Sequence, residues 1–166
     1  IANGWGFESV NAMVKHWPGG GSGEAGRDAH YANGRYAVYP GNNFNAHLIP
    51  FINGAFKLNG KTKMAAAVMP YYTISWNQDK VNNENIANNY NKYLITDLLR
   101  KKYKYDGVVC TDWLVTGDHK AMDNFVDGKP FGVEHLSIAE RHYKILMAGV
   151  DQFGGNNDAK PVIEAY

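Results

Sequence analysis

The chain has 166 residues, of which 45% are hydrophobic, and its 17 Lys plus Arg nearly balance its 16 Asp plus Glu. This length is typical of one domain, and the hydrophobic content excludes a disordered segment. The formal charge of +1 argues against a nucleic-acid partner, which would require a basic face. The longest apolar run, residues 65–69, is far shorter than the ~20 residues of a membrane helix, so no membrane partner is expected. The single cysteine, Cys110, excludes a disulfide framework and a thiolate zinc cluster.

The first part of the chain is predicted to contain two strands and two helices. Residues 12–15 are predicted as a strand, and the apolar run over 65–70 as a second, buried strand. Residues 44–58 are predicted as a helix, although Pro50 disturbs its first turns, and residues 84–102 as an amphipathic helix. The residues expected to face inward are Leu48, Phe51, Ile52 and Phe56 in the first helix and Ile86, Tyr90, Leu94 and Leu98 in the second.

The rest of the chain continues this alternation. Residues 107–111 are predicted as a third buried strand and residues 150–153 as a fourth. Between them, Ser137 and Glu140 form a capping box that opens a helix through Met147, and Gly149 marks its end. The alternation of strands and helices predicts parallel β/α units with right-handed crossovers.

Each predicted strand is followed by a polar, glycine-rich or aromatic loop, and these loops cover residues 15–21, 70–77, 111–119 and 151–157. In a (β/α)-barrel such loops form the active face. Aromatic rings and neutral amides in these loops suit sugars, which offer hydroxyls and apolar ring faces. The loop over residues 18–43 is long, and loops of that length are usually functional.

Asp112 is the first candidate catalytic residue. It directly follows the predicted strand over residues 107–111 and precedes Trp113. A carboxylate at the C-terminal end of a barrel strand points to the substrate and could act as base, nucleophile or metal ligand. The alternative is a structural role, as the N-cap of the next helix or as a turn residue. Met69 and Tyr72 lie at the end of another strand. Taken alone they are typical of core and rim residues, and only a location shared with Lys15 and Asp112 makes them site candidates.

Lys15 and His16 also lie at a strand end, before Pro18 and a run of three glycines at residues 19–21. Adjacent side chains of a strand point to opposite faces, so both reach one ligand only if the strand ends or bulges there. The proline and the glycines permit this. The glycine run lacks the features of a phosphate-binding loop, which favours interpreting it as a hinge.

Asp28 and His30, behind Arg27, form a second polar cluster. Two residues apart, an Asp and a His can pair so that the carboxylate orients a catalytic or metal-bound imidazole. With His16 and Asp112 they could hold a metal ion, but their spacing matches no known zinc motif. Solvated loop residues are the alternative interpretation.

Four segments together resemble glycoside hydrolase family 3. They are Lys-His-Trp-Pro-Gly at residues 15–19, Ala-Val-Met-Pro-Tyr-Tyr at 67–72, Tyr-Asp-Gly-Val-Val-Cys-Thr-Asp-Trp at 105–113 and Ala-Gly-Val-Asp at 148–151. They occur in the family's order across essentially the whole chain. The third segment resembles the family's nucleophile signature, and the first resembles its sugar-binding signature.

The resemblance implies a role for each matching residue. Asp112 matches the catalytic nucleophile. Lys15 and His16 match the pair that hydrogen-bonds hydroxyls of the sugar in the cleaved subsite. Met69 and Tyr72 match residues near the nucleophile that shape this subsite.

The implied reaction is retaining hydrolysis of a terminal β-linked sugar, β-D-glucose in the first place, through a covalent glycosyl-Asp112 intermediate. Trp113 matches an aromatic residue that packs against the sugar beyond the scissile bond. No cofactor and no bound metal are expected. The alternatives are a β-xylosidase or β-N-acetylglucosaminidase of the same family, a non-catalytic sugar-binding barrel and a metal-dependent barrel enzyme.

The resemblance leaves the general acid open between two sources. In most of the family it is a Glu on a second, C-terminal α/β domain, which this chain does not contain. A branch of bacterial β-N-acetylglucosaminidases instead uses an Asp-Ser-His dyad after the Lys-His motif, and Asp28-Ala29-His30 has the same spacing in a similar place. The His that follows Pro-Gly in that branch is replaced here by Gly20, and the loop is longer.

The resemblance also implies an α/β fold that is larger than this chain. The family's catalytic domain is a (β/α)8 TIM-type barrel, which takes ~250 residues. Residues 1–166 correspond to its C-terminal part, roughly the last four strands with their helices. We therefore expect an upstream half-barrel and a downstream α/β domain outside this chain, and no hydrolysis by the chain alone. The family also suggests a secreted or periplasmic location.

Overall fold

The computed structural model describes residues 7–120 and 124–166. Within these ranges the strands are β1 (Met13–Trp17), β2 (Tyr36–Ala37), β3 (Ala67–Pro70), β4 (Ile74–Ser75) and β5 (Val108–Val109). The helices are α1 (Phe44–Ile49), its π-helical continuation η4 (Pro50–Ala55), η6 (Tyr93–Lys102), α2 (Ile138–Ala148) and α3 (Lys160–Ala165). Short 3₁₀ turns cover Glu24–Gly26, Ala32–Gly34, Pro40–Asn42 and Asn88–Tyr90.

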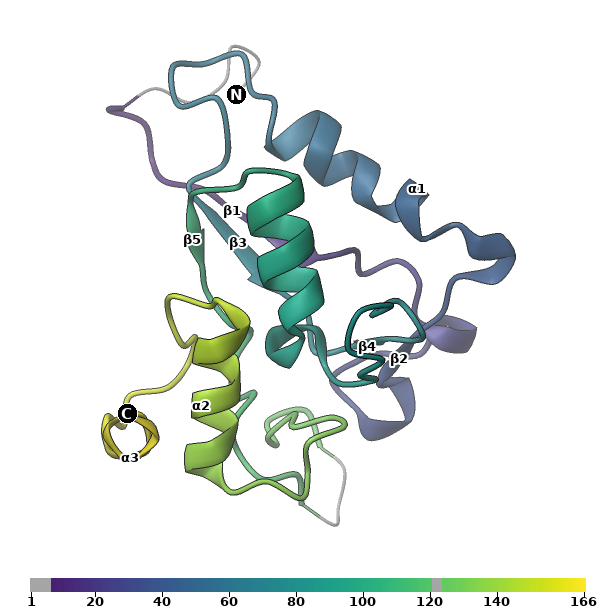
Figure 1. Ribbon diagram of the computed structural model, residues 1–166, viewed down its shortest axis with the longest axis vertical. Helices are drawn as coiled ribbons and strands as arrows, with labels where there is room; N and C mark the ends of the chain where they lie inside the picture. The colour runs from purple at the N-terminus through teal and green to yellow at the C-terminus, as the bar shows by residue number, and fades with distance from the viewer. Residues whose placement is uncertain (1–6, 121–123) are drawn as a thin grey trace.

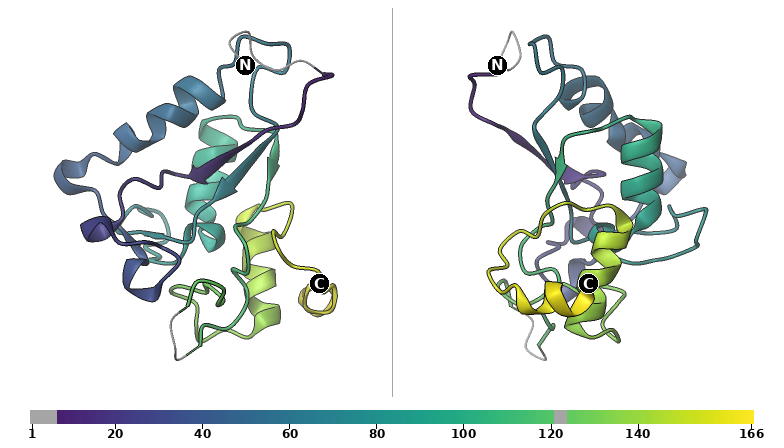
Figure 2. Two further views of the ribbon diagram at one scale, coloured as in Figure 1. Left: turned by 180° about the vertical axis from the view of Figure 1, so that it is seen from behind. Right: turned by 60° about the vertical axis from the view of Figure 1, so that its left-hand side comes forward.

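A parallel three-stranded sheet in the order β1-β3-β5 forms the centre of the molecule. Its helices lie on one face, as the views in Figures 1 and 2 show. Val68 and Val109, which are paired in register, are fully buried beneath them. On the opposite face, Met13 and Val108 are 39% and 41% exposed. The predicted α/β class with parallel strands is therefore confirmed.

The predicted fourth strand over residues 150–153 is wrong as an extended strand. Only an isolated parallel bridge joins Gln152 to Cys110. The reason lies in the side chain of Asp151, which accepts the backbone N–H of Val109 at 2.7 Å and pairs with Arg100. This carboxylate takes the place of a backbone acceptor, so regular pairing does not extend along the segment.

The predicted helix over residues 84–102 begins only at Tyr93. Before it, backbone N–H groups donate to other segments of the chain instead of to carbonyls four residues back, as Asn88 N does to the carbonyl of Thr73 at 2.9 Å. Asn91 Oδ1 accepts from Leu94 N at 3.0 Å at the start of the helix, a bond of the N-cap type. The segment before η6 is therefore a buried loop, although its apolar residues face the core as predicted.

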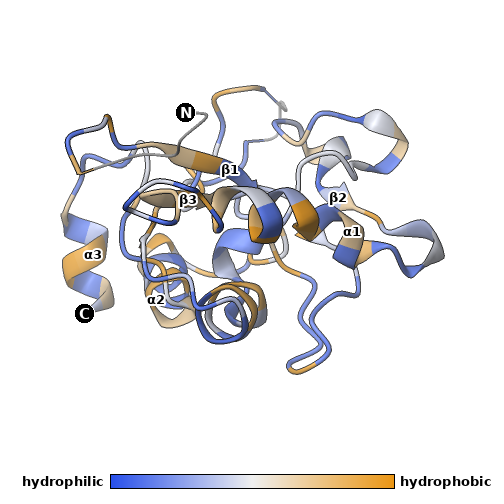
Figure 3. Ribbon diagram, turned by 90° about the horizontal axis from the view of Figure 1, so that it is seen from above, coloured by the Kyte–Doolittle hydropathy of each residue, from blue (hydrophilic) through white to orange (hydrophobic). Residues whose placement is uncertain are grey.

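The helix predicted over residues 44–58 ends at Ala55 and changes its winding at Pro50, where α1 passes into η4. The capping box of α2 is confirmed, because Ser137 accepts from Glu140 N and the Glu140 carboxylate accepts from Ser137 N. The helices combine hydrophobic and hydrophilic stretches, as expected for elements that cover a sheet (Figure 3). None of the helices in the described ranges is long and apolar enough to cross a membrane.

A second, two-stranded parallel sheet joins β2 to β4 and was not predicted. β2 lies inside the long loop over residues 18–43, and two-residue strands carry too little periodicity to be read from sequence. Its pairing links this loop to the segment that follows β3. The loop is thereby fixed beside the C-terminal ends of the central strands.

Leu99 of η6 tests the packing of the helices on the sheet, because its side chain is fully buried. We expect Leu99→Ala to lower the free energy of unfolding by about 2–5 kcal/mol, from lost burial and the cavity left behind. The exposed Lys101 of the same helix provides the control, and Lys101→Ala should change it by less than ~0.5 kcal/mol. Chemical denaturation measures both, and equal effects would contradict this packing.

Candidate active site

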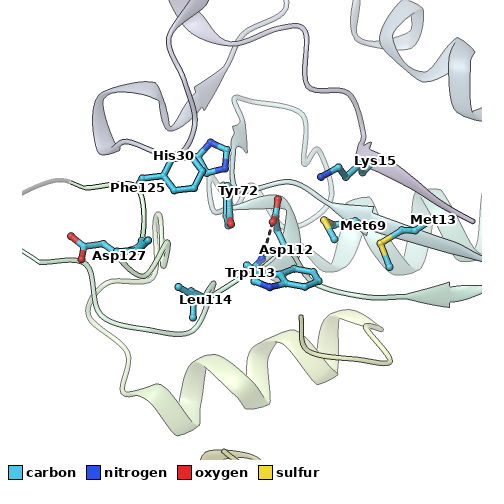
Figure 4. A pocket seen from close by; sticks show the side chains of 11 residues that line it. Met13, Lys15, His30, Met69, Tyr72, Asp112, Trp113, Leu114, Phe125 and Asp127 are labelled. Carbon is cyan, nitrogen blue, oxygen red and sulfur yellow. Dashed lines mark hydrogen bonds between the residues drawn. The ribbon is translucent and has the colours of Figure 1, made fainter. Parts of the chain in front are cut away.

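A cavity of about 520 Å³ opens at the C-terminal ends of the central strands (Figure 4). The strands and the loops that follow them supply its walls. The lining residues are Met13, Lys15, His30, Met69, Tyr72, Asp112, Trp113, Leu114, Phe125, Val126 and Asp127. Five of the six predicted site residues therefore line one cavity, and the sixth, His16, contacts it through Asp112.

Asp112 lies at the centre of this cavity and is 94% buried. Its Oδ1 accepts the backbone N–H of Trp113 at 2.7 Å, and its own N–H donates to Asn89 Oδ1 at 3.2 Å. Its Oδ2 is buried and has no hydrogen-bond partner among the residues that the structure describes. The predicted alternative of a helix N-cap is wrong, because the next helix, α2, is capped by Ser137.

Burial raises the pKa of Asp112 above its usual range. Three neighbouring groups act against burial and lower this pKa: the Trp113 N–H, the Tyr72 hydroxyl and the positive charge of Lys15. Burial and the negative charge of Asp112 raise the pKa of Tyr72, so the Tyr72 hydroxyl remains neutral. Oδ2 of Asp112 therefore lies in a largely desolvated site, with the Tyr72 hydroxyl and the Lys15 ammonium group nearby.

His16 reaches Asp112 because β1 bulges at its end. The pairing with β3 passes from Lys15 to Trp17 and skips His16, as the predicted bulge requires. His16 Nε2 lies 3.5 Å from Asp112 Oδ2, and its ring stacks on Tyr71 at 4.2 Å. Burial and the charge of Lys15 lower the pKa of His16 to about 4, so the imidazole is neutral at physiological pH.

Asp28 and His30 form the pair that their spacing predicts. His30 Nδ1 lies 2.7 Å from Asp28 Oδ1, which also accepts the His30 backbone N–H at 2.9 Å. These two bonds lower the pKa of Asp28. The ring of His30 stands edge-on to Tyr72, with 5.3 Å between ring centroids, and it lines the same cavity as Asp112.

Trp113 is half-exposed and is packed on one side against a pair of glycines. A Cβ atom at Gly154 would lie 2.7 Å from the indole, and one at Gly155 would lie 2.5 Å from it. Gly154 N also donates to Thr111 Oγ1 at 2.8 Å. The loop after residue 150 therefore does not line the cavity, but its glycines let the indole lie flat beside it.

The sequence interpretation included Leu114 in the predicted active-face loop over residues 111–119 but missed the wall formed by Phe125, Val126 and Asp127. These residues belong to the connection between β5 and α2, which spans more than 25 residues. The length of this connection was the available signal, since long loops in compact domains are usually functional. Its residue types alone carry no recognisable motif.

The described residues, 7–120 and 124–166, contain no group of three or more His, Cys, Asp or Glu side chains arranged to hold a metal ion. In particular, His16 approaches Asp112, whereas Asp28 pairs with His30. Cys110, directly after β5, is buried, and burial raises the pKa of its thiol, as expected for a packed small hydrophobic residue.

Comparisons with known proteins identify the family to which the chain belongs. The sequence model described as "Glycosyl hydrolase family 3 N terminal domain" matches residues 2–159. A protein of Dickeya chrysanthemi named periplasmic beta-glucosidase/beta-xylosidase is 40% identical over 176 residues, covering 98% of this chain and 26% of the relative. Beta-glucosidase C of Emericella nidulans is 38% identical over 162 residues, covering 96% of this chain and 24% of the relative.

Among solved structures, the beta-N-acetylglucosaminidase from Thermotoga maritima matches with a TM-score of 0.59 and 21% sequence identity. The match covers 93% of this chain and 28% of that chain, and it shows a shared fold. The chain spans about a quarter of the length of the two curated relatives. Because the family model covers nearly the whole chain, this protein belongs to glycosyl hydrolase family 3.

Proposed function

We propose that this chain carries the nucleophile of a retaining β-glycosidase, and that the nucleophile is Asp112. The observation that carries the proposal is the buried Oδ2 of Asp112 in the wall of a 520 Å³ cavity, because this oxygen accepts no hydrogen bond from the described residues and has the neutral His16 imidazole 3.5 Å away. In the first step Oδ2 attacks the anomeric carbon, the glycosidic C–O bond breaks, and the leaving oxygen takes a proton. Water then hydrolyses the glycosyl-Asp112 ester with retention of configuration.

The neighbours of Asp112 fit the binding of one sugar ring. Lys15 is a cationic donor at the strand end, and neutral His16 adds an imidazole close to Oδ2. Met69 and Tyr72 form the wall around the carboxylate. Trp113 offers an aromatic surface, which suits the C–H face of a sugar beyond the scissile bond.

The substrate that we propose is a terminal β-D-glucoside. The names of the two curated relatives, a beta-glucosidase/beta-xylosidase and a beta-glucosidase, support a neutral sugar of this class. Xylosides are the second candidate for the same reason. The periplasmic relative likewise supports a secreted or periplasmic location.

For the proton donor we propose His30, held by Asp28. Asp28 accepts a hydrogen bond from Nδ1, so the proton given to the leaving oxygen is the one that the imidazolium form carries on Nε2, and His30 is left as the neutral imidazole. His30 shares the cavity with Asp112, and its charge lowers the pKa of Asp112. This arrangement places an oriented imidazole beside the proposed nucleophile within one chain, and it requires no Glu from another domain.

We further propose that the chain is the C-terminal part of a (β/α)8 barrel. The open face of the central sheet supports this, because parallel sheets are normally covered on both faces. Met13, Ala67 and Val108, paired in one row across the three strands, would then form a layer of the barrel interior. The remainder of the barrel would come from a longer protein, the full-length protein in the experiments below.

The nucleophile is tested by Asp112→Asn in the full-length protein. We expect turnover of a nitrophenyl β-glucoside to fall by at least ~10⁴-fold, because the amide cannot form the ester, while glucose binding is retained. The matched control is Asp106→Asn, an exposed aspartate at the other end of β5, which should leave kcat near normal. Near-normal kcat in Asp112→Asn would contradict the assignment.

The proton donor is tested by His30→Ala with two leaving groups. Phenyl β-glucoside needs protonation of its leaving oxygen, so its kcat/KM should fall ~10²–10⁴-fold. Dinitrophenyl β-glucoside leaves without a proton, so its glycosylation should change little. His135→Ala, at an exposed histidine, serves as control. Equal losses on both substrates, or none, would exclude His30 as the donor.

The pH dependence tests the environment of Asp112. The carboxylate must be ionised to attack, so kcat/KM should fall as pH drops through its pKa, above the ~3.9 of a free aspartate because burial raises it. Tyr72→Phe removes a hydroxyl that lowers this pKa, so the acid limb should move to higher pH. An unchanged or lower midpoint in a kcat/KM–pH profile would contradict the role of Tyr72.

A further inference from the structure

Lys129 is an almost completely buried cation that the catalytic scheme does not use. Its side chain is 1% exposed, and it ends a tight turn over residues 124–129. Its Nζ donates to the backbone carbonyls of Asn124 at 3.4 Å and Phe125 at 3.3 Å, and to that of Asp127. The turn therefore closes around the ammonium group.

The shape of the turn therefore depends on the positive charge of Lys129. Removing an ammonium from water costs several kcal/mol, and carbonyl dipoles that point at the ion offset this cost. An apolar side chain of the same length would fill the space without that cost, but it would leave the carbonyls without their donor. Within the turn, Asn124 Oδ1 accepts the backbone N–H of Val126 at 2.9 Å, and Asn124 Nδ2 donates to Asp127 Oδ1 at 3.0 Å.

The turn carries Phe125, which lies against His30. The two rings stack with 4.2 Å between centroids and an interplanar angle of 15°. Figure 4 shows Phe125 and His30 together at one side of the cavity, with Tyr72 and Asp112 next to them. Two loops that are far apart in sequence thus meet at this stack.

Lys129 also lies near two residues that contact His30, namely Tyr72 and Asp28. Its Nζ lies 5.9 Å from the centroid of the Tyr72 ring, and its charge lowers the pKa of Asp28. Asp28 fixes Nδ1 of His30, Phe125 fixes the plane of its ring, and Tyr72 stands edge-on to it. The orientation of the imidazole is thereby set by three neighbours, all of which the Lys129 side chain touches or influences.

We propose that Lys129 and Phe125 are positioning residues for His30: Lys129 closes the 124–129 turn, and the turn presses Phe125 onto the imidazole so that Nε2 faces the leaving oxygen. This proposal rests on the proposed role of His30 as proton donor. It predicts that loss of either residue damages proton transfer to the leaving group while the attack by Asp112 is preserved.

The experiment compares Lys129→Met and Phe125→Leu in the full-length protein, with phenyl and dinitrophenyl β-glucosides as substrates. For both variants kcat/KM on the phenyl glucoside should fall about tenfold to hundredfold, because a misplaced catalytic group is costly. On the dinitrophenyl glucoside it should stay within about twofold, since that leaving group needs no proton. Phe125 is half-exposed, so Phe125→Leu remains informative even if Lys129→Met does not fold.

Two controls separate positioning from general damage. Phe125→Tyr keeps the stacked ring and should restore most of the phenyl glucoside activity. Lys160→Met removes an exposed lysine of α3 and should change neither substrate. Equal losses on both substrates, or unchanged activity in Phe125→Leu, would overturn the positioning role alone. If His30→Ala itself shows no dependence on the leaving group, the proton-donor assignment fails and this proposal fails with it.

Discussion

Parallel hydrogen bonding between β1, β3 and β5 determines where the functional groups of this chain lie. The register pairs Lys15 with Met69, and the pairing of Val68 with Val109 brings Asp112, which follows β5, to the same end of the sheet. Since a slip of one residue turns every side chain to the opposite face, this register fixes which residues reach the cavity. The register shifts at the end of β1, and this bulge lets His16 reach Asp112 as well.

The remaining walls depend on two long connections, which are fixed in different ways. The loop after β1 is fixed by the β2–β4 pairing, and it brings Asp28 and His30 to the cavity. The connection from β5 to α2 is closed by the buried ammonium of Lys129. These two loops meet where Phe125 stacks on His30. The central sheet therefore positions the proposed nucleophile, Asp112, and the two loops together position the proposed proton donor, His30.

Much of this could be predicted from sequence, and the physical reasons for the exceptions are specific. Strand ends followed by glycine or aromatic residues correctly located Lys15, Met69, Tyr72, Asp112 and Trp113, because parallel strands bring their carboxyl ends together. Helical spacing of apolar residues overextended η6 towards Glu84, because backbone N–H groups there, such as that of Asn88, bond to other segments of the chain instead of within a helix. The roles of Lys129 and Phe125 could not be predicted from sequence. A buried lysine and a loop phenylalanine acquire such roles only through the folded contacts around them.

The central claim, that Asp112 becomes covalently glycosylated, is tested most directly by trapping. A 2-deoxy-2-fluoro β-glucoside with a good leaving group slows hydrolysis of the glycosyl ester, so the intermediate accumulates on the nucleophile. Peptide mass spectrometry of the full-length protein after this treatment should find the fluoroglucosyl group on the peptide that contains Asp112. A fluoroglucosyl group on any other residue would contradict the assignment of Asp112 as the nucleophile.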